Sequence, residues 1–172
     1  ERRANFESKS RCGRLFTSVV TDAKSVTPLE IKVLDVLNAS VIKDQNEELL
    51  FECLKCYFYW FFKIVTADAN YDTAGCLKII KGGLSDKKQV NRKYWLMAMG
   101  SYFLKVRENE ASKKFINDIS GALIDNFNEF EANPLKSPTT IVYVILCIIK
   151  GFSEDQFKSF INKSLPILSN QK

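Results

Sequence analysis

The chain has 172 residues, of which 46% are hydrophobic and 12% aromatic, and this is enough for one domain with a packed core. Its 7 glycines and 4 prolines are too few for the many turns of a β-sandwich or barrel, so the composition favours helices. The formal charge of +5 permits binding to a polyanion without requiring it, and the absence of histidine removes the commonest general base and metal ligand.

Apolar residues recur at helical spacing from the start of the chain. We expect a first helix over residues 6–25. A second helix, over residues 28–41, is opened by Thr27-Pro28, because proline suits the first helical position. The third helix, over residues 50–64, is apolar on nearly all sides and is therefore predicted to be the hydrophobic centre, covered on more than one side.

Short polar joints separate the next helices. A fourth helix, capped by Asp72, is predicted to end at Gly82-Gly83. A fifth runs over residues 87–106. A sixth begins at residues 108–110 and carries an unbroken apolar stripe to residue 130.

Two more helices complete the prediction. Ser137-Pro138 opens a seventh helix, which ends before Gly151. Ser153 is placed to cap an eighth, with Gln156 at its third helical position.

Eight helices joined in pairs give a repeating unit close to the ~40–47 residues of HEAT or armadillo repeats. The sequence therefore predicts an all-α fold of antiparallel helix pairs, stacked as a HEAT-like α-solenoid of about four repeats. Residues 1–172 are expected to form a single segment cut from a longer solenoid, because no polar capping repeat is apparent at either end. A non-repetitive helical bundle is the alternative.

Five cysteines, an odd number, lie on predicted helical faces and suit free thiols in a reducing cytosol. Cys53-x-x-Cys56 has no second pair or histidine for zinc, so core packing is expected. The apolar runs 49–65 and 141–149 are interrupted or too short to span a membrane, and no signal peptide is expected. With no phosphate loop, metal motif or nucleophile elbow, we expect a cytoplasmic protein that is not an enzyme and uses no cofactor or small-molecule substrate.

The candidate binding surface is a cluster of cations at the start of the fifth helix. Residues four apart share a helix face, so several of these side chains project together and are suited to the phosphates of ribosomal RNA or to an acidic protein. The alternative is a solvated edge on which the arginine pairs with acidic neighbours. The cluster consists of Lys87, Lys88, Arg92 and Lys93.

Asp86 precedes this cluster and has two predicted roles. Gln89 follows it by three residues, the spacing of a capping box. The spacing from Asp86 to Arg92 also allows a ladder of aspartates and arginines between neighbouring repeats, which HEAT proteins use.

The segment around these residues is the run Gly82-Gly83-Leu84-Ser85-Asp86-Lys87-Lys88-Gln89-Val90-Asn91-Arg92-Lys93-Tyr94-Trp95. This run resembles a known family, the fungal-type general-control scaffold that activates the amino-acid-starvation kinase acting on initiation factor two alpha. The resemblance implies a HEAT-repeat platform that associates with the ribosome, works with an ABC-type ATPase partner, and reaches the kinase through regions outside this chain.

Two other functions remain open from the sequence. A karyopherin-like adaptor would bind basic protein cargo through acidic inner helices, without ribosome contact, and the basic cluster argues mildly against it. An all-α enzyme would need an enclosed polar pocket, for which no motif is present.

Overall fold

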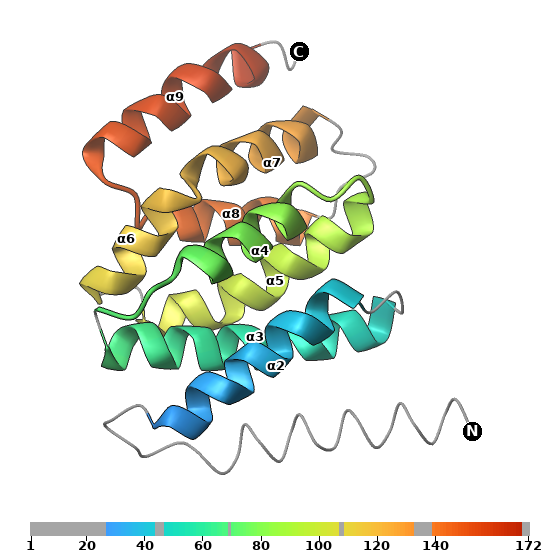
Figure 1. Ribbon diagram of the computed structural model, residues 1–172. Helices are drawn as coiled ribbons and strands as arrows, with labels where there is room; N and C mark the ends of the chain where they lie inside the picture. Colours follow the sequence, from blue (N-terminus) through green and yellow to red (C-terminus); the bar gives the residue numbers. More distant parts are fainter. Residues whose placement is uncertain (1–26, 44–46, 69, 107–108, 133–138, 170–172) are drawn as a thin grey trace.

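The computed structural model describes residues 27–43, 47–68, 70–106, 109–132 and 139–169. Within these ranges all regular secondary structure is helical, so the predicted all-α class is confirmed (Figure 1). The helices are α2 (Pro28–Lys43), α3 (Glu47–Ala67), α4 (Ala74–Leu84), α5 (Gln89–Val106), α6 (Glu110–Asp118), α7 (Ser120–Ala132), α8 (Thr139–Ile149) and α9 (Glu154–Ser169).

The predicted helices and the observed ones correspond with two exceptions. The predicted first helix, residues 6–25, lies outside the described residues. The predicted sixth helix is two helices, α6 and α7. The described part of the chain therefore also holds eight helices, but they are not the same eight.

The break between α6 and α7 lies at Ile119, which leaves helical geometry with φ −105° and ψ 7°. Its N–H donates to Ile116 O at 3.3 Å, a tighter turn than that of an α-helix. The apolar stripe nevertheless continues, because Phe115, Ile119 and Leu123 are all buried. A stripe that passes through a break without interruption gives no sign of it in the sequence.

Gly82 and Gly83 do not end α4, so that prediction is wrong. Both lie inside its last turn, the helix continues to Leu84, and Ser85 N–H donates to Lys81 O at 3.0 Å. No described glycine has a positive φ. Gly83 is needed for another reason: a Cβ there would overlap the indole ring of Trp95.

The capping residues also differ from the prediction at two of three helix starts. Asp86 and Gln89 form no capping box, because α5 begins only at Gln89 and Asp86 N–H donates to Gly83 O at 3.3 Å. At α4 the N-cap residue is Thr73, although the Asp72 carboxylate does accept a bond from Ala74 N–H at 2.9 Å.

The predicted cap of α9 is confirmed. Ser153 Oγ accepts from Gln156 N–H at 3.5 Å, and Ser153 O accepts from Phe157 N–H at 2.9 Å. The side chain of Gln156 instead contacts another helix, since its Oε1 accepts a hydrogen bond from Ser120 Oγ of α7 at 2.7 Å.

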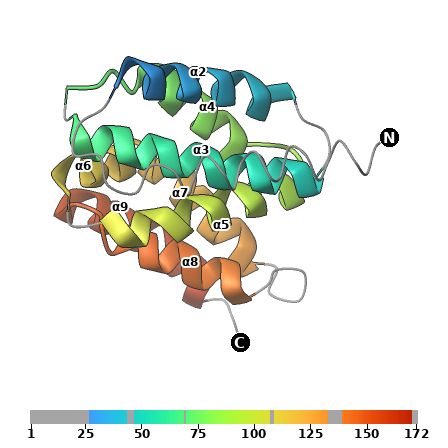
Figure 2. The ribbon, with the colours of Figure 1, turned by 90° about the horizontal axis from the view of Figure 1, so that it is seen from below.

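The helices form two rows, which Figures 1 and 2 show from the front and from below. In one row α2 packs on α4, α4 on α7 and α7 on α9; in the other α3 packs on α5 and α5 on α8. The rows are joined by the pairs α2–α3, α4–α5 and α7–α8. The α2–α3 pair is antiparallel, because Glu30 at the start of α2 meets Lys63 near the end of α3.

Neighbouring helices of the second row are parallel and keep a constant register. The rings of Phe51 and Tyr94 lie 5.4 Å apart, and those of Tyr59 and Tyr102 lie 5.7 Å apart. In both contacts the partner on α5 comes 43 residues after the one on α3. From α5 to α8 the step is similar, since a Cβ on Gly100 would lie 2.5 Å from Cγ1 of Val144.

Helix α3 is the centre of the core, as predicted. Trp95 of α5 meets the rings of Tyr57 and Phe58 edge-on at 6.2 and 5.8 Å, and Phe115 of α6 lies 4.5 Å from Phe61. Helix α3 is thus covered by α2, α5 and α6. Its aromatic side chains that are at most 2% exposed are Tyr57, Phe58, Trp60, Phe61 and Phe62.

Candidate functional site

The connection between α4 and α5 is held in place by Asp86. Its carboxylate accepts from the backbone N–H of Lys88 at 2.7 Å and from Nδ2 of Asn91 at 3.0 Å. This local side-chain bonding is typical of aspartate next to a turn. The negative charge of Asp86 is therefore engaged by the connection itself.

Arg92 is not a surface cation, since it is only 8% exposed. Its Nη1 donates to the backbone carbonyl of Asp86 at 2.5 Å, and its Nη2 is paired with the carboxylate of Glu129 on α7. Arg92 thus ties α5 to the connection before it and to the following helix of the other row. Its predicted pairing with an acidic neighbour is observed, and its role in a ladder across repeats stays a prediction.

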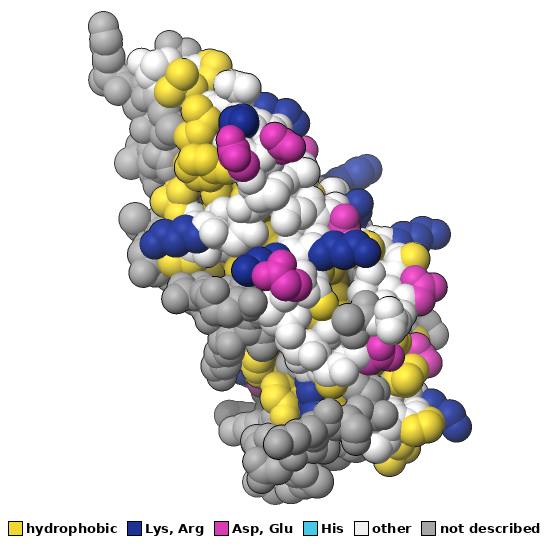
Figure 3. Space-filling view, turned by 90° about the vertical axis from the view of Figure 1, so that its left-hand side faces the viewer, with side chains coloured by type: hydrophobic (Ala, Val, Ile, Leu, Met, Phe, Trp, Pro, Cys, Tyr) yellow, Lys and Arg dark blue, Asp and Glu magenta, His cyan; other side chains and the backbone are white. Residues whose placement is uncertain are grey.

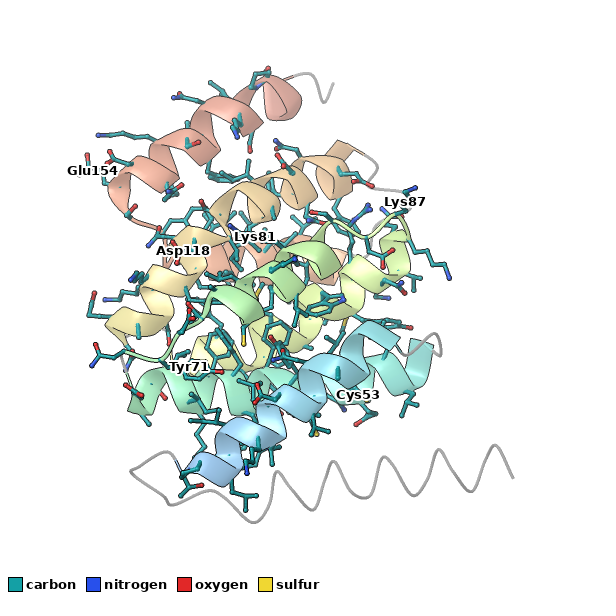
Figure 4. All side chains as sticks on the ribbon, viewed as in Figure 1. Cys53, Tyr71, Lys81, Lys87, Asp118 and Glu154 are labelled. Carbon is teal, nitrogen blue, oxygen red and sulfur yellow. The ribbon has the colours of Figure 1, made fainter. Side chains whose placement is uncertain are left out.

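The lysines of the predicted cluster are placed differently from Arg92. Lys87 and Lys88 are exposed, and Lys93 is half-buried. Among the described residues no carboxylate lies within ion-pair distance of any of the three. Figure 4 labels Lys87 in the connection between α4 and α5, near the start of α5. Within the part of the chain that the structure describes, three of the four predicted cations therefore have no ion-pair partner.

Sequence reasoning missed two further lysines, Lys78 and Lys81, on α4. Both are exposed, both lie one helical turn apart on the same face, and neither has an ion-pair partner in the described ranges. A regional charge count would have found them. Residues 74–93 hold six cations and one acidic residue, whereas the other 152 residues hold 19 of each.

The whole formal charge of +5 therefore resides in residues 74–93, which we call the basic segment. Several cations elsewhere have carboxylate partners. Lys113 pairs with Glu110 at 2.7 Å and Lys158 with Glu154 at 2.7 Å, both within one turn of a helix.

One ion pair is buried and joins the first helix pair. Lys63 Nζ lies 2.6 Å from Glu30 Oε1 and 5.1 Å from the centre of the Trp60 ring. Glu30 Oε2 accepts from Thr27 N–H at 2.6 Å, and Glu30 N–H donates to Thr27 Oγ1 at 3.4 Å, which completes a capping box. Burial acts to raise the pKa of Glu30, but the bonds from Lys63 and Thr27 outweigh it and hold the pKa below its ordinary value of 4.5.

The described cysteines are free thiols that pack within helices. Cys56 is buried, and this burial, with the nearby Cys53 and Glu52, raises the pKa of its thiol to about 11, so it stays protonated at neutral pH and is a poor nucleophile. The described ranges contain no group of three or more histidine, cysteine, aspartate or glutamate side chains that could hold a metal ion. Nor is any helix in them long and apolar enough to cross a membrane.

A second surface lies at the end of the row formed by α2, α4, α7 and α9. Phe157, Ile161 and Leu165 of α9 are four residues apart and 47%, 41% and 60% exposed, while Phe160 and Ser164 on the adjoining face are buried against the molecule. Figure 3 shows hydrophobic side chains gathered at the upper end of the molecule, where α9 lies. We call these three residues the α9 stripe.

The chain matches one family model over residues 16–170, nearly its whole length. The family is described as general control nonderepressible 1 (Gcn1) N-terminal. No curated protein and no solved structure matches the chain.

Proposed function

Because the chain belongs to the Gcn1 N-terminal family, we propose that it is a non-catalytic segment of a HEAT-repeat scaffold, part of a ribosome-associated regulator of translation. The regulator helps to activate the initiation factor two alpha kinase during amino-acid starvation. The family match carries this proposal, and the packing of the helices and the charge of the surface support it.

The two rows of helices support stacked repeats. A register of 43 residues from α3 to α5 falls within the ~40–47 residues of a HEAT or armadillo repeat. In this arrangement α2–α3 and α4–α5 are repeats, and α6 and α7 together take the place of one helix before α8. Helix α9 then opens a fourth repeat.

The α9 stripe supports a solenoid that continues. Each internal repeat of a solenoid covers the apolar face of its neighbour. Helix α9 packs on α7, and within the described ranges no helix covers its stripe. A further helix pair on this stripe would extend both rows without changing their geometry.

The surface of the stack, in particular Lys87, Lys88 and Lys93, meets the ribosome. The proposed partners of the whole regulator are the ribosome and an ABC-type ATPase, with the kinase reached through regions outside this chain, in the cytoplasm. A karyopherin-like adaptor for basic cargo is less well supported, because the excess charge of this chain is positive and concentrated on one segment.

Cosedimentation with purified ribosomes at low salt tests the proposal. We expect the chain to pellet with ribosomes and to lose this property when Lys87, Lys88 and Lys93 are changed to Glu. The matched control changes three exposed lysines elsewhere, Lys32, Lys114 and Lys163, to Glu, which alters the net charge equally. Equal loss in both variants, or no pelleting of the unaltered chain, would refute the ribosome contact.

A further inference from the structure

We propose that the outer face of α4 binds the phosphate backbone of an RNA duplex, with Lys78 and Lys81 as the contacting cations and Lys87 and Lys88 extending the contact. This deepens the proposed function, on which it rests for the source of the RNA. Figure 4 labels Lys81 on α4 and Lys87 in the connection that follows.

The first support is electrostatic. Helix α4 contains no acidic residue, and Lys78 and Lys81 have no ion-pair partner in the described part of the chain. They lie with Lys87 and Lys88 in residues 74–93, where the one acidic residue, Asp86, is already bonded to the connection. Such a surface attracts polyanions and gains affinity when counterions are released from the phosphates.

The second support is steric. Gly75 and Gly82 are exposed on the same face as the two lysines, and a Cβ at either position would meet nothing within 4 Å. Glycine weakens a helix relative to alanine, and here no internal contact requires it. Gly83, in contrast, is required by Trp95. The two open glycines leave the backbone of α4 accessible to a closely approaching partner.

The class of partner follows from what this face presents. Its exposed residues include no large apolar side chain, whereas a protein interface gains most of its energy from buried aromatic or apolar anchors. It also presents no aromatic ring on which single-stranded bases would stack. A regular array of phosphates, as on an A-form duplex recognised by its shape, fits a surface of lysines and bare backbone. The residues on this face are Ala74, Gly75, Lys78, Lys81, Gly82 and Ser85.

The experiment measures binding of the chain to a blunt-ended RNA duplex by fluorescence anisotropy over a range of salt concentrations. The charge variant is Lys78→Gln with Lys81→Gln, and its control is Lys32→Gln with Lys114→Gln. We expect the charge variant to bind about tenfold more weakly and to lose about two from the slope of log K against log salt, since each phosphate contact contributes about one. The control is expected to keep most of the affinity and slope.

The steric variant is Gly82→Leu, with Gly121→Leu on α7 as its control, because Gly121 is also exposed with nothing within 4 Å. Both changes are expected to raise the thermal midpoint, since leucine favours a helix more than glycine does. Only Gly82→Leu is expected to weaken binding to the duplex, by several-fold.

Several outcomes would overturn the inference: no binding of the duplex at low salt, equal loss in the charge variant and its control, or equal binding of poly-glutamate at the same charge concentration. The last result would assign the face to an acidic protein instead. Ribosome pelleting separates this inference from the proposed function. If the unaltered chain pellets with ribosomes but the α4 variants bind the duplex as well as it does, only the α4 contact is refuted. If duplex binding depends on the α4 lysines but the chain does not pellet with ribosomes, only the ribosome as the source of the RNA is refuted.

Discussion

Gly83 on α4 lies directly under the indole ring of Trp95 on α5, so closely that a methyl group at position 83 would overlap the ring. Trp95 in turn meets Tyr57 and Phe58 of α3 edge-on, so its ring connects two successive helix pairs. The absence of a side chain at Gly83 thus leaves room for a ring that packs between repeats.

Gly83→Ala is expected to destabilise the fold by about 1–3 kcal/mol, because the added methyl group must displace a buried ring. Gly82→Ala, one residue earlier on the open face, is expected to stabilise it by up to about 1 kcal/mol. Urea denaturation of both variants checks this pair. A shift of the same sign at the two positions would show that the close packing on Trp95 is absent.

Arg92→Met is expected to destabilise the chain by about 1–3 kcal/mol, since it removes the bonds to the Asp86 carbonyl and to Glu129 while keeping an apolar stem. Lys88→Met, at an exposed position without an ion-pair partner in the described ranges, is expected to stay within about 0.5 kcal/mol of the unaltered chain. Denaturant midpoints measure both. If Arg92 tolerates the change as well as Lys88 does, Arg92 belongs to the binding surface and not to the fold.

These positions show which parts of the site the sequence predicts. The cluster of cations and its position at a helix start follow from residues adjacent in the chain. The burial of Arg92 does not, because Glu129 is 37 residues away and only the folded chain brings it near. The two lysines of α4 do not follow from the motif for another reason: they lie on the helix before it, and the net charge of the whole chain does not show where its cations gather.

The sequence predicts the fold to about the same extent as it predicts the site. Apolar spacing located the helices, because that spacing follows directly from burying one face. It did not locate the break at Ile119, where the stripe continues unchanged, nor the function of Gly83, which depends on Trp95 twelve residues later. At the end of α4 the local signal misled because a tertiary contact, the packing of Gly83 on Trp95, requires the glycine there.

Replacement of Glu30 by Gln is expected to cost about 1–3 kcal/mol at neutral pH, because the ionised carboxylate holds hydrogen bonds from Lys63 and Thr27. The pKa of Glu30 is lower in the folded chain than its ordinary value of 4.5. Its contribution is therefore fully present above that value and is lost as the pH falls through the lower, folded pKa.

The measurement is the difference in unfolding free energy between the unaltered chain and Glu30→Gln from pH 7 down to pH 3. We expect a constant difference at the upper end that shrinks below pH 4.5. A difference that grows on acidification would mean that the pKa of Glu30 is raised, and that the buried pair with Lys63 does not form.

The α9 stripe is expected to contribute little to the stability of this chain. Ile161→Gln with Leu165→Gln is predicted to change the unfolding free energy by no more than about 0.5 kcal/mol per position, because both side chains are exposed. Phe160→Ala, which removes a buried ring 5.0 Å from that of Phe127, is predicted to cost about 3–5 kcal/mol.

Binding of an environment-sensitive hydrophobic dye gives a second readout for the stripe. The double glutamine variant is expected to bind less dye than the unaltered chain, since it removes exposed apolar surface. If the double variant unfolds as readily as Phe160→Ala, the stripe is part of the core of this segment and offers no surface for a further repeat.

The salt dependence of ribosome affinity tests the central claim most directly, namely that this stack of helices works through the charge of one surface. The unaltered chain is titrated onto ribosomes at salt concentrations between about 50 and 200 mM, a range over which binding through several phosphate contacts weakens by about a thousandfold or more. Two variants are titrated beside it: Lys87→Gln/Lys88→Gln/Lys93→Gln and the control Lys32→Gln/Lys114→Gln/Lys163→Gln. We predict a steep loss of affinity with salt for the unaltered chain and the control, and a slope smaller by about three for the first variant. Equal slopes for all three proteins would contradict the account.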